Sequence, residues 1–169
     1  KLYRGKVVTV KPVPPLTIKD ITAVTDTFIG PQMQAPPPYS AAKHKGKPLY
    51  HYARQGILIE KEAKAIEIFS LQIEGYDPVS EQVSITVTCG KGTYIRVLAA
   101  DIGKKLGCGA YLTALRRTRS GGFSVEEALD GAGLFKQEIR SDDLLRRMLT
   151  VEQAVEKHAK HSQQEKAFT

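Results

Sequence analysis

The sequence has 169 residues, of which 41% are hydrophobic and 25% are charged, a composition typical of a globular protein of one domain, or one domain with a tail. It shows no apolar run long enough to span a membrane and no secretory signal pattern. The net charge of +7 favours a polyanionic partner, either a nucleic acid or an anionic membrane surface. Because the chain starts at Lys1 without methionine, we expect a truncated or processed piece.

The first 30 residues predict a strand and a helix. Residues 6–12 are predicted to form a short strand that ends at a proline. Residues 16–30 carry apolar side chains at helical spacing. Thr17 and Asp20 have the spacing of an N-terminal cap, and Gly30-Pro31 is a stop signal for the helix.

The next segments alternate between loop, helix and strand signals. Residues 32–47 are predicted to be irregular, because three prolines fix the backbone and remove donors. A short helix is expected over 48–56, ended by Gly56. Residues 65–73 and 82–89 are predicted strands, and the second alternates apolar and polar side chains as a half-buried strand does.

The second half predicts one strong helix and several weaker elements. Its strongest helix signal has Ile95, Leu98, Ala99, Ile102 and Leu106 on one face. Further predictions are a strand over 110–123, a capping box at Ser124–Glu127, and helices near 142–148 and 150–161. This order predicts an α+β fold with a mixed, mainly antiparallel sheet and flanking helices.

Cysteine and histidine residues predict neither a disulfide nor a metal site. Cys89 and Cys108 lack metal-ligand spacing and fit free thiols in a reducing cytoplasm. The four histidines form no metal triad. We therefore expect no metal and a cytoplasmic location.

The stretch CGKGTYIRVLAADIG, residues 89–103, is the first candidate site. Gly92 permits a tight turn, Thr93 can cap the helix, and Tyr94 and Arg96 then leave a strand-to-helix junction. The helix dipole disfavours a cation in the first turn. Arg96 could instead hold a carboxylate bidentately. The alternative is an Arg paired with a structural acid and a Tyr in the core, and the pattern alone favours that alternative.

Two basic clusters are candidates for nucleic-acid contact. The first is a proline-rich loop in which alternating lysines have tyrosines nearby, and cations with aromatic rings suit phosphates and bases. The second is LRRTRSGG, in which Arg117 and Arg119 would share one face of a strand with Arg116 on the other. A solvated loop and a solvated strand edge are the alternatives. The cations concerned are Lys43, Lys45, Lys47, Arg116, Arg117 and Arg119.

Three stretches together resemble the TruB family of tRNA pseudouridine synthases in its bacterial form. They are the start KLY, the segment GPQMQAPPPYSAAKHKGKPLYHYARQG, and the block CGKGTYIRVLAADIGKKLGCGAYLTALRRTRSGGF. The similarity runs from about residue 1 to residue 129. It implies the pseudouridine synthase fold and isomerisation of uridine 55 in the T arm of tRNA, with no cofactor and no metal. It also implies base flipping into a pocket, as base-modifying enzymes require.

The resemblance implies a role for four residues. Arg96 matches the family arginine that pairs with the catalytic aspartate, and Tyr94 matches a pocket tyrosine beside it. Tyr3 matches the tyrosine that packs on the flipped base and is implicated in removal of the C5 proton. Leu115 matches a pocket leucine.

The sequence departs from the family pattern most at the catalytic aspartate. That residue belongs to a motif before the K-x-Y segment, and none of the seven aspartates stands in such a context. The family's base-flipping histidine belongs to the same stretch, and no PUA domain is recognisable after Leu129. Smaller departures are Gly90, often serine in the family, and Tyr111, often histidine. We expect residues 1–130 to form the C-terminal portion of the catalytic domain and 131–169 a helical tail.

Two functional classes remain open. One is a tRNA-modifying enzyme, most simply a monomer, whose aspartate lies outside this chain; the other is a non-catalytic RNA-binding remnant. Tyr3, Tyr94 and Arg96 favour the enzyme, because a binder needs no arginine directed at a missing carboxylate. The resemblance also implies a long loop after Arg4, whereas Gly5 follows directly here. Either the protein has lost this loop or the chain skips residues there; we favour the skip and expect the two Cα atoms to lie well beyond bonding distance.

Overall fold

The structure is a computed structural model that describes residues 9–136 and 140–166. It divides into two compact units, Lys1–Ala114 and Leu115–Thr169. Each is described below by itself.

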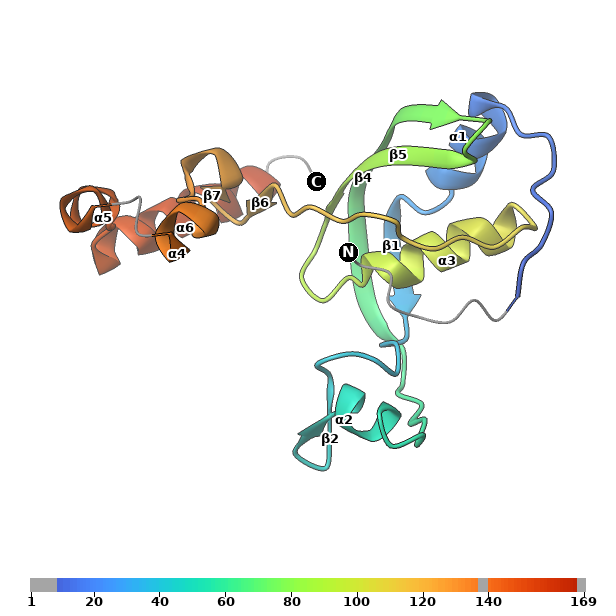
Figure 1. The fold of residues 1–169 in the computed structure, drawn as a ribbon, viewed down its shortest axis with the longest axis horizontal. Helices are drawn as coiled ribbons and strands as arrows, with labels where there is room; N and C mark the ends of the chain where they lie inside the picture. Colours follow the sequence, from blue (N-terminus) through green and yellow to red (C-terminus); the bar gives the residue numbers. More distant parts are fainter. Residues whose placement is uncertain (1–8, 137–139, 167–169) are drawn as a thin grey trace. The chain divides into compact units, whose positions relative to one another are not determined.

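A three-stranded antiparallel sheet forms the framework of the first unit (Figure 1). Its strands are β1 (Gly30–Gln34), β4 (Lys64–Asp77) and β5 (Gln82–Cys89), in the order β1-β4-β5. Ile68 of the central strand pairs with Gly30 on one side and Cys89 on the other. The predicted α+β class with mainly antiparallel pairing is confirmed.

Helices α1 (Ile18–Asp26) and α3 (Ile95–Lys105) contribute to the hydrophobic core over β4. A register shift between Ile68 and Ser70 inserts one residue into β4. This bulge brings Ile68 and Leu71 to the same core despite their spacing of three. Phe28 after α1, and Leu98 and Ile102 of α3, complete the buried cluster.

Helix α1 begins as its sequence predicts. The Thr17 hydroxyl accepts from the Asp20 N–H, and the Asp20 carboxylate accepts from the Thr17 N–H at 2.8 Å, so the capping box is complete. The hydrogen bond from the Thr17 hydroxyl lowers the pKa of Asp20 below its ordinary value. The helix ends at Asp26, before the predicted stop, and Gly30 instead begins β1 with φ of 101°.

The loop after α3 lies directly against Gly103 of that helix. A Cβ atom placed on Gly103 would stand 2.2 Å from the backbone N of Ala110 and 2.2 Å from the carbonyl carbon of Gly109. The Gly109 N–H donates to the Gly103 carbonyl at 2.8 Å. Only a residue without a side chain permits this approach.

The segment between β1 and β4 extends beyond the end of the sheet (Figure 1). It holds a small hairpin of β2 (Lys43–His44) and β3 (Lys47–Pro48), followed by α2 (Leu49–Ala53). The predicted short helix is confirmed. The expectation that residues 32–47 are wholly irregular is wrong: they include part of β1 and this hairpin. Proline is tolerated in β1 because β1 is an edge strand.

The second unit consists of short elements. A two-stranded hairpin, β6 (Arg119–Ser120) and β7 (Phe123–Ser124), leads into the 3₁₀ helix η1 (Val125–Glu127). Helices α4 (Gly131–Phe135), α5 (Ser141–Arg147) and α6 (Val151–Lys166) follow. The predicted helices near 142–148 and 150–161 are confirmed.

Three predicted elements are wrong. Residues 110–118 are not a strand, and only the two-residue strands β6 and β7 form in that region, around the turn at Gly121 and Gly122. Ser124 does cap the next element, but its hydroxyl accepts from the Glu126 N–H of a 3₁₀ helix rather than forming a box with Glu127. Residues 9–12 of the predicted first strand have no regular structure, and its earlier part lies outside the described residues.

Candidate functional site

A tight turn joins β5 to α3 and positions Tyr94 and Arg96. The Gly90 N–H donates to the Glu67 carbonyl at 2.8 Å, and Gly92 turns the chain with φ of 85°. Tyr94, rather than Thr93, is the N-cap residue, and its side chain makes no capping hydrogen bond. The Thr93 hydroxyl donates instead to the Gly90 carbonyl at 2.9 Å, so it stabilises the turn.

Gln34, at the end of β1, binds the backbone of Tyr94 at two points. The Tyr94 N–H donates to Gln34 Oε1 at 2.7 Å, and Gln34 Nε2 donates to the Tyr94 carbonyl at 3.3 Å. Gln34 is only 7% exposed. The sequence does not indicate this role for Gln34, because one glutamine in a proline-rich stretch carries no recognisable signal.

Arg96 is exposed and contacts the loop after β1. Its Nη2 donates to the Tyr39 carbonyl at 2.8 Å. The Tyr39 hydroxyl in turn donates to the Ala53 carbonyl of α2 at 3.3 Å. Among the side chains that the structure describes, no carboxylate pairs with Arg96. The other guanidinium N–H groups can therefore donate to a further acceptor. The alternative predicted from the sequence, a structural acid paired with Arg96, is not found among these side chains.

Lys43, Lys45 and Lys47 are all exposed on the β2–β3 hairpin. Both turn residues, Lys45 and Gly46, have positive φ, at 47° and 80°, as a type I′ turn requires. The Tyr52 hydroxyl donates to the His44 carbonyl at 3.1 Å and so ties the hairpin to α2. The hairpin thus presents three cations on a defined backbone.

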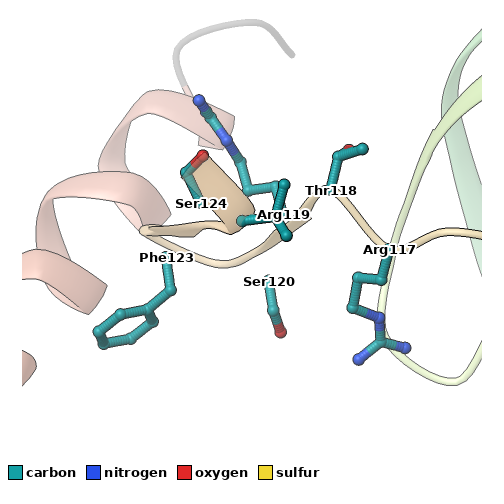
Figure 2. A pocket seen from close by; sticks show the side chains of 7 residues that line it. Arg117, Thr118, Arg119, Ser120, Phe123 and Ser124 are labelled. Atoms are coloured by element: carbon teal, nitrogen blue, oxygen red, sulfur yellow. The ribbon is translucent and has the colours of Figure 1, made fainter. Parts of the chain in front are cut away.

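Leu115, Arg116, Arg117 and Arg119 belong to the second unit and are exposed. Arg117 and Arg119 line a shallow pocket of about 210 Å³ with Phe123 (Figure 2). Their guanidinium groups extend away from each other in Figure 2. The predicted shared strand face is wrong, because only Arg119 lies in a strand.

The remaining sequence predictions concern the N-terminal residues, metal binding, membrane spans and the cysteines. Tyr3 and the Arg4–Gly5 junction lie outside the described residues. Among the residues that are described, no group of three or more His, Cys, Asp or Glu side chains could hold a metal ion. No helix in that part of the chain is long and apolar enough to cross a bilayer. Cys89 and Cys108 are free thiols.

Comparison with known families gives two matches that cover most of the chain. Residues 3–95 match the TruB family pseudouridylate synthase N-terminal domain. Residues 96–156 match the tRNA pseudouridylate synthase B C-terminal domain. The similarity therefore continues beyond residue 129, where the resemblance of the sequence motifs ends.

Individual relatives agree with the family matches. A tRNA pseudouridine synthase B of Nitrosospira multiformis is 53% identical over 120 residues, which are 70% of this chain and 38% of that protein. One of Desulfotalea psychrophila is 47% identical over 131 residues, covering 74% of this chain and 52% of the relative. A chain in a crystal structure of a Cbf5–Nop10–Gar1 complex superposes with a TM-score of 0.60 at 25% identity, covering 86% of this chain and 40% of that one.

The chain thus spans about 40–50% of the length of these two bacterial relatives. The first family match alone covers more than half of its residues. On this evidence, the chain belongs to the TruB family of pseudouridine synthases.

Proposed function

We propose that the protein containing this chain isomerises uridine 55 in the T arm of tRNA to pseudouridine, in the cytoplasm. Membership of the TruB family supports the reaction class. The observation that carries the proposal is Arg96, which stands at the first turn of α3 with one donor fixed by Tyr39 and no carboxylate partner in the described residues. A catalytic aspartate from outside this chain would supply that partner.

The reaction needs one bond to break and another to form. The aspartate assists cleavage between C1′ of the ribose and N1 of the uracil. The base then rotates, C5 bonds to C1′, the C5 proton leaves, and N1 takes up a proton, so that the product is an isomer of uridine. Arg96 would hold the aspartate through a planar pair of N–H donors. Tyr94 would line the base pocket, and Tyr3 would pack on the base and assist removal of the C5 proton. The family resemblance also assigns Leu115 to binding of the base.

The basic side chains would contact the RNA backbone. Lys43, Lys45 and Lys47 are exposed on one hairpin, where they can reach phosphates. Arg117, Arg119 and Phe123 line one pocket. This pocket therefore combines cations for phosphates with an aromatic ring on which a base could stack.

Tritium release tests the proposal. The full-length protein is incubated with a T-arm stem–loop labelled with tritium at C5 of uridine, and released tritium is counted. We expect release approaching one equivalent, and none from a stem–loop with cytidine at position 55 and label in its other uridines. Binding of the stem–loop without release would refute the enzyme and support an RNA-binding remnant.

A further inference from the structure

Gln34 is a buried polar side chain whose partners lie sixty residues away in the sequence. It is the last residue of β1, and both ends of its amide bind Tyr94. Burial of an amide is unfavourable unless its polar atoms are paired. The two hydrogen bonds therefore fix both the Gln34 side chain and the Tyr94 backbone that it binds.

The two hydrogen bonds hold the N-cap residue of α3 in place. Tyr94 is the N-cap residue, with φ of −98° and ψ of 102°, and its own side chain caps nothing. Gln34 accepts from its N–H and donates to its carbonyl, as a neighbouring strand would. The point at which the chain leaves the turn and enters α3 is thereby fixed to the edge of the sheet.

The same segment also reaches Arg96. Five residues after Gln34, the Tyr39 carbonyl accepts from Arg96 Nη2. Residues 34 and 39 thus hold the backbone of Tyr94 and the side chain of Arg96 from one side. We propose that Gln34 is a positioning residue that sets the direction in which Arg96 presents its remaining donors. This inference rests on the proposed function, since it assigns Gln34 to that site.

The test uses the full-length protein and three variants. Gln34→Met keeps the length of the side chain and removes both hydrogen bonds, whereas Gln34→Glu keeps the acceptor for the Tyr94 N–H and removes the donor. Gln32→Met is the matched control, because Gln32 lies on the same strand and its amide binds the Phe28 carbonyl instead. Single-turnover tritium release, the Kd for tRNA and the thermal unfolding midpoint are measured for each.

We expect Gln34→Met to lower the single-turnover rate constant by about 10- to 100-fold, because small displacements of a catalytic group have effects of this size. The Kd should stay within two-fold of wild type. Gln34→Glu should lie between Gln34→Met and wild type, and Gln32→Met should match wild type. Hydrogen exchange at the Tyr94 amide should become faster in Gln34→Met than in the control.

The inference would be overturned by any of the following results. One is a rate constant for Gln34→Met within two-fold of wild type. Another is a loss that Gln32→Met shares, or one that is fully explained by a weaker Kd. If Gln34→Met does not fold, a Gln34→Glu variant that folds and reacts at the wild-type rate would overturn it equally. A wild-type protein that releases no tritium would instead refute the proposed function itself.

Discussion

Replacing Gly103 by alanine tests the contact between α3 and the loop that follows it. The added Cβ would lie 2.2 Å from Ala110 N, whereas ordinary contacts begin near 3.4 Å, so the loop must move by about 3.4 − 2.2 = 1.2 Å. Overpacking of this kind costs about 1–3 kcal/mol. The upper part of this energy range applies to Gly103→Ala, because the atoms nearest to the added Cβ are backbone atoms. The higher helix propensity of alanine offsets about 1 kcal/mol of this loss of stability.

We therefore expect Gly103→Ala to lower the free energy of unfolding by about 1–2 kcal/mol. Denaturant unfolding followed by circular dichroism measures this change, since the sequence has no tryptophan to report by fluorescence. Gly90→Ala is the matched control in the same unit, because its Cβ would approach nothing closer than the Glu67 carbonyl at 3.6 Å. A Gly103→Ala protein as stable as wild type would show that the described packing is incorrect.

Three further predictions concern RNA binding and the second unit. If all six basic side chains contact phosphate, the logarithm of tRNA affinity should fall with the logarithm of salt concentration at a slope of about −4 to −5. Neutralising Lys43, Lys45 and Lys47 should reduce the magnitude of that slope by about 2–3. An affinity that does not change with salt concentration would refute the phosphate contacts. Glu127, whose pKa is lowered by its hydrogen bond from Lys157, should stabilise the second unit above pH 4.5, and this contribution should be lost as pH falls through its lower folded pKa. Denaturation of wild type and Glu127→Gln across this range measures it, and a difference that persists at pH 2 would contradict the assignment. Gly122→Ala should destabilise the contact with α6 by about 1–3 kcal/mol, because its Cβ would lie 2.2 Å from the Lys157 carbonyl oxygen. Gly131→Ala is the control, since its Cβ would meet nothing within 4 Å. The prediction would be contradicted if hydrogen exchange in α6 were no faster in Gly122→Ala than in this control.

Elements defined by local signals could be predicted from the sequence. Helix α1 has a reciprocal Thr17–Asp20 cap, and β5 has an unbroken alternation, so neither depends on distant residues for its recognition. Helix α3 likewise shows its buried face in the spacing of Leu98, Ala99 and Ile102. In each case propensity, pattern and tertiary burial agree.

Elements defined by distant partners could not be predicted. Pro31 lies in β1 opposite Glu67, which is possible only because β1 is at the edge of the sheet. Residues 110–118 contain strand-forming residues but form no regular structure. The junction at Tyr94 and Arg96 was found from its turn signals, yet the side chain that holds it, Gln34, belongs to another strand. The arrangement of the site therefore depends on pairing across sixty residues.

The catalytic role of Arg96 is the central claim, and Arg96→Lys in the full-length protein tests it most directly. Lysine offers a point charge where a planar fork is needed, so it would hold the aspartate in a different direction. Because a displacement of about 1 Å at a catalytic group costs roughly 10²-fold, the single-turnover rate of tritium release should fall by about 10²-fold. A rate within a few-fold of wild type, with folding unchanged, would contradict the account.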